Sequence, residues 1–244
     1  MGRKPPSRGQ SGRSKGLAPP DDQSTIAVRA LEFVKDGAVI GLGTGRAATA
    51  FVEALGAAVK GGLRVRGVPT SDATAALASQ LGIPLTALAD VGEIDITFDG
   101  ADEVDPRLDL IKGYGGAMVR EKIVAASSRR LVILVGSEKL VPILGSRGIL
   151  PVEIVPFGLP LCRRRLTELG CRPTVRMVNA RAYVTDSGNQ ILDCSISPIQ
   201  DATALEQAIV SIPGVVGTGL FIGMADTVLI QDGDAVVERR QGGP

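Results

Sequence analysis

A cluster of four carboxylates follows an apolar segment in the first half of the chain. Asp99, Asp102, Glu103 and Asp105 come directly after Ile94–Phe98, whose alternating apolar residues predict a β-strand. Asp99 is therefore expected at the carboxyl end of a strand, where open α/β sheets bind ligands. Carboxylates this close repel one another, which raises the pKa of some of them. Such clusters bind metals, cationic groups or hydroxyl-rich ligands. An ordinary acidic turn is the alternative, and the spacing matches no calcium-binding loop.

A lysine and a glutamate stand on either side of a glycine-rich loop. Lys112 is at the entrance of the loop, and Glu121 lies about one turn into a helix predicted over residues 117–128. We expect the flanking Arg120 and Lys122, with the positive end of the helix, to keep the Glu121 carboxylate ionised and ready to act as a base. An Arg-Glu-Lys run is also typical of a solvated helix face, so the run alone does not establish catalysis.

A glycine turn joins a strand predicted over 38–42 to a helix predicted over 47–59. The segment Gly41-Leu-Gly-Thr-Gly45 lets backbone N–H groups approach an anion closely, and the positive end of the helix favours negative charge. It is not the dinucleotide-binding fingerprint, because Arg46 occupies the position of the third glycine. A single phosphate is the better ligand, with Arg46 as a charged donor. A turn required only for packing is the alternative.

The composition restricts the chemistry further, because the chain of 244 residues contains no histidine. This excludes Ser-His-Asp and Cys-His nucleophiles, histidine acid/base catalysis and most transition-metal sites. Catalysis must therefore rest on Asp, Glu, Lys, Arg, Tyr, Ser or Thr. Cys162, Cys171 and Cys194 form no C-x-x-C pair, so they predict neither a disulfide framework nor a zinc site.

Charge is unevenly distributed along the chain. Residues 1–20 hold five basic residues and no acidic one, which leaves 22 basic and 26 acidic residues in the rest and predicts no nucleic-acid partner. Residues 1–22 are rich in Gly, Pro and Ser, which predicts a disordered basic tail, with a weak polyanion-binding arm as the alternative. The tail lacks the apolar stretch of a secretory signal, and no apolar run can span a bilayer. We expect a soluble, cytoplasmic protein with no membrane partner.

Alternating strands and helices position these residues. Residues 23–145 predict the parallel sheet of a Rossmann-like α/β domain, to which 218–240 return through a hairpin across Asp232-Gly233. The order β, α, β, β, β, α over 146–217 predicts a smaller α+β domain that resembles a ferredoxin-like fold and is expected to serve oligomerisation. Beyond those named above, strands are predicted over 63–68, 131–135, 152–155, 174–178, 182–185 and 190–195, and helices over 24–35, 71–81, 163–170 and 202–209.

Short motifs stand in a specific order along the chain. They are Gly-Leu-Gly-Thr-Gly at 41–45, Thr-Ser-Asp-Ala-Thr at 70–74, Leu-Gly-Ile-Pro at 81–84, Asp-Gly-Ala-Asp-Glu-Val-Asp at 99–105, Arg-Glu-Lys-Ile at 120–123, Ser-Glu-Lys-Leu at 137–140, Pro-Val-Glu-Ile-Val-Pro-Phe at 151–157 and Ile-Pro-Gly-Val-Val at 212–216. This series, over residues 23–238, resembles the A type of ribose-5-phosphate isomerase.

The resemblance implies an aldose–ketose isomerase that interconverts D-ribose 5-phosphate and D-ribulose 5-phosphate through a cis-enediol, in the non-oxidative pentose phosphate pathway. It implies Glu121 as the acid/base between C2 and C1, with Asp99, Asp102 and Lys112 around the reacting carbons. It also implies that no metal or organic cofactor is needed and that the chain forms a homodimer or homotetramer. Substrate contacts are implied for Thr44, Gly45, Arg46, Ala47, Gly100, Ala101, Gly113, Tyr114, Gly115 and Lys139, of which residues 44–47 would hold the phosphate.

The chain departs from the family pattern at two places. The family loop usually reads Thr-Gly-Ser-Thr where this chain has Thr-Gly-Arg-Ala at 44–47, and a lysine that the family often carries on its first helix corresponds to Gln23. We hypothesise that Arg46 supplies the lost charge. Tyr114 stands where the family prefers glycine and would narrow the entrance of the site.

Three other functions share some of these features. A relative of the CoA transferases would use a glutamate such as Glu121 as a nucleophile, and acyl-CoA exchange would identify it. A glucosamine-phosphate enzyme would be expected to use a histidine. A non-enzymatic sugar-phosphate sensor would need a helix-turn-helix module, for which residues 1–20 are too short and too rich in Pro and Gly.

Overall fold

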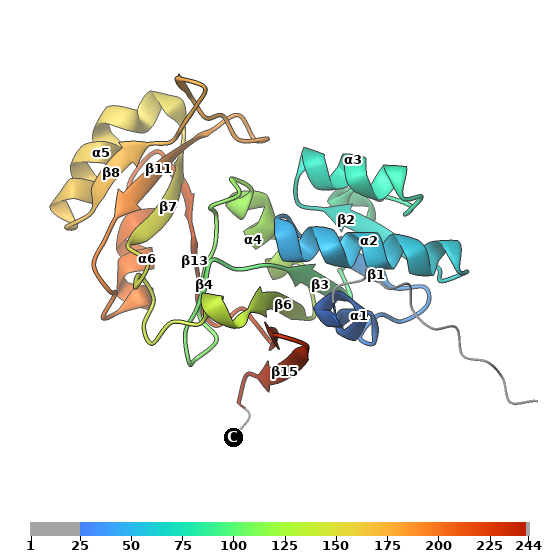
Figure 1. Cartoon of the computed structure of the whole chain (residues 1–244). Coiled ribbons are helices and arrows are strands. Elements are labelled where there is room, and N and C mark those ends of the chain that lie inside the picture. Colours follow the sequence, from blue (N-terminus) through green and yellow to red (C-terminus); the bar gives the residue numbers. More distant parts are fainter. Residues whose placement is uncertain (1–24, 243–244) are drawn as a thin grey trace, which may run out of the picture.

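The computed structural model describes residues 25–242, so the predicted basic tail lies outside the described residues. The described chain forms two main sheets, the larger at the right of Figure 1 and the smaller at the left. Across residues 25–242, no helix has both the length and the apolar character needed to cross a membrane.

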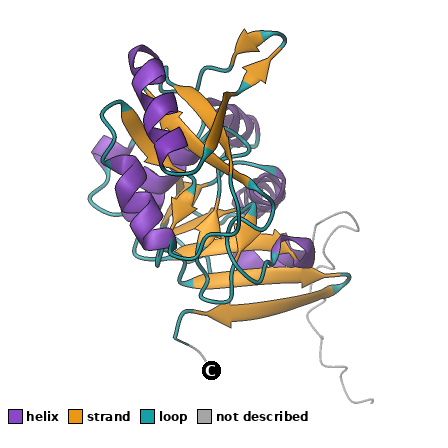
Figure 2. Ribbon diagram, turned by 90° about the vertical axis from the view of Figure 1, so that its left-hand side faces the viewer, coloured by secondary structure: helices purple, strands orange, loops and turns teal. Residues whose placement is uncertain are grey.

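The larger sheet has six strands in the order β15-β14-β6-β3-β1-β2. All neighbouring pairs are parallel except β14 and β15, which form an antiparallel hairpin next to the end marked C in Figure 2. The prediction of a parallel sheet to which a C-terminal hairpin returns is confirmed. The strands are β1 Val39–Leu42, β2 Arg66–Pro69, β3 Ile96–Asp99, β6 Leu131–Gly136, β14 Thr227–Asp232 and β15 Ala235–Arg240.

Helices pack on both faces of this sheet (Figure 1). Side chains alternate along β1, so Ile40 and Leu42 join the buried cluster under the first three helices, whereas Val39 packs with Val124 of the fourth. Apolar cover on both sides explains why the parallel strands read as short, continuous apolar runs. The helices are α1 Thr25–Leu31, α2 Arg46–Lys60 and α3 Asp72–Gln80 with the first cluster, and α4 Met118–Ala126 with the second.

The smaller sheet is antiparallel and has the strand order β12-β7-β11-β8. With its two helices it follows the order β-α-β-β-α-β, so the predicted ferredoxin-like arrangement is confirmed. Its elements are β7 Ile149–Ile154, α5 Leu159–Glu168, β8 Arg172–Val175, β11 Gln190–Ser195, α6 Ala202–Val210 and β12 Val215–Thr218.

Two details of this sheet differ from the sequence prediction. The strand predicted over 182–185 is wrong, because only Ala182 is in a strand, β10 (Arg181–Ala182), which pairs with β9 (Met177–Val178) in a separate hairpin. The fourth strand of the sheet is β12, which was not predicted. Its pairing with β7 shifts register between Val215 and Gly217, and this irregularity breaks the alternation by which a strand is recognised.

A third, three-stranded sheet in the order β13-β5-β4 was also not predicted. Each strand has two residues, which is too short for a periodic pattern. Because β5 leads directly into Lys112, this small sheet sets the position of the lysine. The strands are β4 Glu103–Val104, β5 Leu110–Ile111 and β13 Leu220–Phe221, and short 3-10 helices span Leu88–Asp90, Ser137–Lys139 and Pro156–Gly158.

The strand order creates a crevice at the carboxyl edge of the larger sheet. From β1 the chain continues to β2 on one side and later to β3 on the other, so the connections that leave β1 and β3 diverge. Open α/β sheets bind ligands at such a switch point. The glycine turn follows β1 and the acidic cluster begins at the end of β3, so both open into this crevice.

Candidate active site

A buried lysine joins two carboxylates at this edge. The Nζ atom of Lys112 lies 2.9 Å from Asp99 Oδ2 and 3.1 Å from Glu121 Oε2, and none of the three side chains is more than 5% exposed. Asp99 ends β3, Lys112 follows β5 and Glu121 lies on α4. Three of the four residues predicted as catalytic are therefore brought into direct contact from three separate elements.

The second oxygen of Asp99 is held by the backbone. Asp99 Oδ1 accepts hydrogen bonds from the N–H groups of Gly100 at 2.7 Å and Thr44 at 3.2 Å. Lys112 Nζ donates to the Gly100 carbonyl at 2.5 Å. Gly43 leaves room for the carboxylate, because a Cβ there would lie 2.3 Å from Asp99 Oδ1. The glycine turn is thus required by the position of Asp99.

Burial controls the protonation of this group. It raises the pKa of Glu121 to about 8, an effect that the nearby Asp99 carboxylate increases and Lys112 opposes. Burial also raises the pKa of Asp99, against the attraction of Lys112. Burial would lower the pKa of Lys112, but the two carboxylates outweigh it, so the pKa is raised and the amine remains an ammonium. The site can therefore gain or lose a proton near neutral pH.

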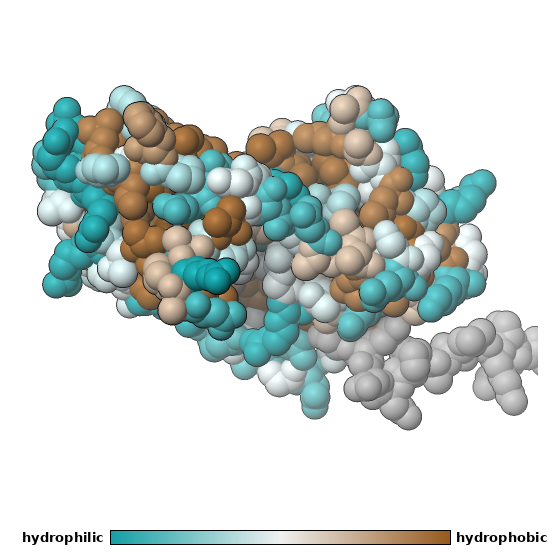
Figure 3. Space-filling model, turned by 90° about the horizontal axis from the view of Figure 1, so that it is seen from above, coloured by the Kyte–Doolittle hydropathy of each residue, from teal (hydrophilic) through white to brown (hydrophobic). Residues whose placement is uncertain are grey.

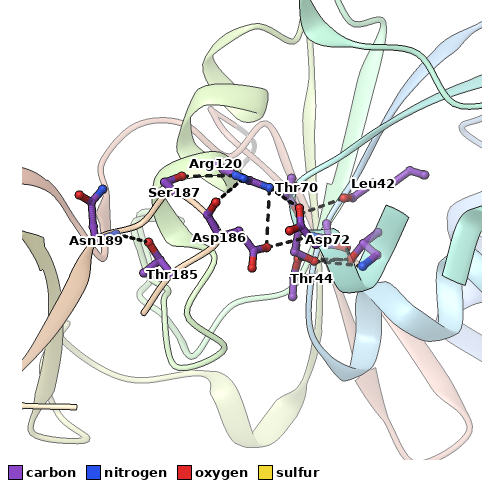
Figure 4. A network of polar contacts seen from close by, with 12 residues as sticks. Leu42, Thr44, Thr70, Asp72, Arg120, Thr185, Asp186, Ser187 and Asn189 are labelled. Carbon is purple, nitrogen blue, oxygen red and sulfur yellow. Dashed lines mark hydrogen bonds and ion pairs between the residues drawn. The ribbon is translucent and has the colours of Figure 1, made fainter. Parts of the chain in front are cut away.

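The cations that flank Glu121 in sequence contact other groups. Arg120 Nη1 lies 2.8 Å from Asp72 Oδ1, and Figure 4 shows Arg120 directed at Asp72 and at the loop that carries Asp186. Lys122 Nζ lies 2.6 Å from Glu206 Oε1. Successive helical residues point about 100° apart, so these cations lie on other faces of α4. The prediction that they keep Glu121 ionised is wrong, because its charged partner is Lys112.

A cavity of about 350 Å³ opens in front of the lysine and Glu121. Twelve of the fourteen residues predicted to contact substrate or catalyse line it. Asp99, which is buried and contacts Lys112, and Tyr114 are the two that lie outside the lining. The lining residues are Thr44, Gly45, Arg46, Ala47, Gly100, Ala101, Asp102, Lys112, Gly113, Gly115, Glu121, Leu134, Val135, Gly136, Glu138 and Lys139.

One end of the cavity is the start of α2. The N-cap Gly45 has a φ of 99° and offers no side-chain cap, so the first N–H groups of this 15-residue helix remain available to an anion. Arg46 is 92% exposed there and lies 3.7 Å from Glu138. The rings of Phe51 and Phe98 stack with centroids 4.1 Å apart, which fixes the helix against β3.

A cluster of hydroxyl groups supports the same turn, and of its members only Thr44 was predicted as a site residue. Thr44 Oγ1 lies 2.8 Å from Thr70 Oγ1, 2.9 Å from Ser71 Oγ and 3.3 Å from Thr74 Oγ1. Thr74 in turn donates to the Gly43 carbonyl at 3.0 Å. The signal that could have revealed the cluster is its position. Thr70, Ser71 and Thr74 follow β2, which is the parallel neighbour of β1, and Thr44 follows β1.

The three residues of the acidic cluster that follow β3 divide into two roles. Asp102 faces the cavity, and its Oδ2 accepts a hydrogen bond from the Tyr114 N–H at 3.0 Å. Burial raises the pKa of Asp102. Glu103 is buried and accepts the N–H groups of Gly145 and Arg147 at 2.6 and 2.7 Å, so it fixes a loop. Asp105 likewise accepts backbone N–H groups within its own turn.

Neither a cluster of metal ligands nor a disulfide is present among residues 25–242. Within residues 25–242, no group of three or more His, Cys, Asp or Glu side chains could hold a metal ion. The three cysteines are free and buried.

The fold and the cavity together define an α/β enzyme that acts on a small ligand at the carboxyl edge of its sheet. The sequence model of ribose 5-phosphate isomerase A (phosphoriboisomerase A) matches residues 66–235. The chain therefore belongs to the ribose 5-phosphate isomerase A family, and the resemblance found in its motifs is confirmed.

Relatives and solved structures agree with this assignment. The chain is 53% identical over 215 residues to the ribose-5-phosphate isomerase A of Roseiflexus castenholzii, which covers 87% of this chain and 92% of the relative. The structure of the Methanocaldococcus jannaschii ribose 5-phosphate isomerase A is 41% identical, with a TM-score of 0.85 over 88% of this chain and 96% of that one. A ribose-5-phosphate isomerase in complex with phospho-erythronic acid is 37% identical, with a TM-score of 0.86 over 88% and 96%. The predicted fold class is thus confirmed.

Proposed function

We propose that the chain interconverts D-ribose 5-phosphate and D-ribulose 5-phosphate through a cis-enediol, with Glu121 as the acid/base. The observation that carries the proposal is the contact of Lys112 with both Glu121 and Asp99 beside the cavity. Membership of the family supports the reaction. The related structure that holds phospho-erythronic acid supports a phosphorylated sugar acid as a ligand of this fold.

The proposed proton transfer follows from the protonation of the site. Glu121 removes the proton from C2 of the open-chain aldose, and the electron pair forms the C1–C2 double bond while the C1=O π pair moves onto O1. O1 then gains a proton and the C2 hydroxyl loses one, so that the C2–O2 pair becomes the ketose carbonyl and the C1–C2 π pair takes the proton back from Glu121 at C1. A carboxylate with a pKa near 8 is a stronger base than an ordinary one and still releases its proton again. The Lys112 ammonium stabilises the charge that develops on the substrate oxygen. Asp102, which lines the cavity, assists ring opening and holds hydroxyl groups, and Asp99 holds the Lys112 ammonium in place.

The rest of the cavity binds the substrate in this proposal. Thr44, Gly45, Arg46 and Ala47 hold the phosphate at the N-terminus of α2, where binding energy remote from the reacting carbons keeps the sugar in register. Tyr114 lies outside the lining and contributes through its N–H group, which donates to Asp102. The remaining substrate contacts come from Gly100, Ala101, Gly113, Gly115 and Lys139.

The wider setting is proposed from the same family membership. The enzyme acts in the cytoplasm, in the non-oxidative pentose phosphate pathway, and needs no metal or organic cofactor because Lys112 supplies the positive charge. Residues 23–145 with 218–240 form the catalytic domain, and 146–217 form a domain that assembles a homodimer or homotetramer. Exposed apolar surface on the half that contains the smaller sheet supports this assembly (Figure 3). Within 146–217, Phe157 is 96% exposed and Met177 is 54% exposed.

The direct test compares the wild type with Glu121→Gln in ribose 5-phosphate conversion, measured in EDTA. General acid/base catalysis contributes about 10²–10⁴-fold, so kcat is expected to fall by that factor. Glu53→Gln, on the exposed side of α2, is the matched control and should retain full activity. A wild type without turnover would overturn the reaction, and acyl-CoA exchange would then be assayed. A fully active Glu121→Gln would overturn only the assignment of the base.

A further inference from the structure

The loop between Lys112 and α4 is held by an arginine of the smaller sheet. Arg176, between β8 and β9, donates from Nη1 to the carbonyls of Gly113 at 2.9 Å and Tyr114 at 3.2 Å. Its Nε and Nη2 atoms bond to the two oxygens of Asp193 at 2.9 and 2.5 Å. The Arg176 side chain is only 15% exposed. It lies outside the cavity lining and has no part in the proton transfer described above.

Because a peptide unit is rigid, this contact with the carbonyl groups also fixes the direction of the N–H groups in the same peptide units. In a trans peptide the C=O and N–H groups point in opposite directions. The Gly113 carbonyl shares its peptide unit with the Tyr114 N–H, and the Tyr114 carbonyl shares the next unit with the Gly115 N–H. Because Arg176 holds both carbonyls on its own side, both N–H groups are turned away from Arg176, and Gly115 itself lines the cavity. One of them, the Tyr114 N–H, donates to Asp102.

The loop has one internal hydrogen bond, from the Gly116 N–H to the Gly113 carbonyl at 3.1 Å, in addition to these outside contacts. Gly113 and Gly116 have φ values of 112° and 87°, and the freedom of glycine makes many other conformations accessible to the loop. Tyr183, which directly follows β10 of the separate hairpin, packs on the same loop, because a Cβ at Gly116 would lie 2.4 Å from Tyr183 Oη. Thus the smaller sheet and this hairpin confine a loop of the active site on both sides of Tyr114.

We propose that Arg176 is a positioning residue of this enzyme. It orients two successive peptide units so that the Tyr114 N–H holds Asp102 and the Gly115 N–H faces the substrate, and Asp193 orients Arg176 in turn. The inference rests on the proposed isomerase function. It assigns the smaller sheet a role in catalysis itself, in addition to any role in assembly.

The kinetic test uses four variants of the full chain with ribose 5-phosphate as substrate. For Arg176→Ala we expect kcat to fall about 10- to 100-fold, the range for misplacement by roughly 1 Å. KM should change little, because the phosphate end is untouched. Arg176→Lys keeps the charge but lacks the fork that bridges two carbonyls and a carboxylate, so it should not restore kcat. Asp193→Asn should lose less than Arg176→Ala, and Arg181→Ala, exposed on the same hairpin, should retain wild-type kcat.

Two further measurements separate positioning from mere stability. Added guanidinium should restore part of the kcat of Arg176→Ala and leave its melting temperature unchanged. Hydrogen exchange at the Tyr114 and Gly115 amides should accelerate in ligand-free Arg176→Lys. Wild-type kcat together with wild-type exchange would overturn the proposal. If the wild type lacked isomerase activity, the proposed function would fail, while amide exchange would still test Arg176. If Arg176→Ala did not fold, Arg176→Lys and Asp193→Asn would decide the question.

Discussion

The two ends of the cavity differ in how far their charged and hydrogen-bonding groups are exposed to water. At the proton-transfer end, Asp99, Lys112 and Glu121 are nearly excluded from water and are paired with one another. At the phosphate end, Arg46 is 92% exposed and the first N–H groups of α2 have no side-chain cap. The difference teaches that proton transfer depends on fixed charges whose pKa values burial has shifted, whereas anion binding depends on donors that remain accessible. Substitutions at the proton-transfer end should therefore lower activity far more than substitutions at the phosphate end.

The largest effect is expected for Lys112→Met, which leaves two buried carboxylates without a counter-charge. The pKa of Glu121 should rise further, so that the base stays protonated at neutral pH and kcat falls by about 10²–10⁴-fold. The pH dependence of kcat/KM gives the decisive measurement, because the acidic limb should move to higher pH in the variant. Lys60→Met, exposed at the end of α2, is the control. An unshifted limb would contradict the role given to the ammonium.

A second substitution tests the proton-transfer end of the cavity without removing a charge. A Cβ at Gly43 would lie 2.3 Å from Asp99 Oδ1 and 2.6 Å from the Phe98 carbonyl, so Gly43→Ala must displace the carboxylate. We expect kcat to fall by about 10²-fold, as for a displacement of roughly 1 Å. In Gly92→Ala the new methyl group meets nothing within 4 Å, and activity should be unchanged. Equal activities of the two variants would show that Asp99 tolerates displacement.

At the phosphate end a smaller effect is expected for Arg46→Ala. A hydrogen bond to a charged group contributes about 1.5–3 kcal/mol, so the KM for ribose 5-phosphate should rise about 10-fold or more, with kcat nearly unchanged. Arg46→Lys retains the charge and should recover most of the affinity. An unchanged KM in Arg46→Ala would reject the hypothesis that Arg46 replaces the family's lysine, whose counterpart Gln23 lies outside the described residues.

The smallest effect concerns stability. The pKa of Glu121 is raised from 4.5 to about 8, so the folded chain keeps a proton that the unfolded chain releases above pH 4.5. This group's contribution to stability is fully present below pH 4.5 and is lost as the pH rises to about 8. Glu121→Gln abolishes that loss. Its melting temperature, relative to that of the wild type, should rise between about pH 5 and pH 9, by about 2–4 °C for each kcal/mol of stability that the wild type loses. A constant difference would contradict the raised pKa.

Much of the fold could be predicted from the sequence because its elements carry long or sharp signals. The apolar runs before Gly43 and before Asp99 placed β1 and β3 to within two residues. The two-residue strands carry no period at all, and β12 has an irregular pairing. These elements exist because of partners distant in the chain, which no local pattern records.

The candidate site could likewise be predicted in part from the sequence. Residue types and strand ends identified Asp99, Lys112 and Glu121, and the family resemblance supplied roles that spacing alone left open. Their contact depends on β5, which carries Lys112 to the end of β3 and was not predicted. Arg176 was missed because it comes from the other sheet and acts on carbonyl groups, which every residue possesses.

The position of β14 has a consequence for synthesis of the chain. This strand lies between β6 and β15 but is separated from β6 in sequence by the entire smaller sheet. While the ribosome makes residues 137–226, β6 remains an unprotected edge for a time on the order of ten seconds at roughly 5–20 residues per second. The smaller sheet, whose strands all lie within 149–218, can be complete before then. The part of the enzyme that is translated first is thus the last to be finished.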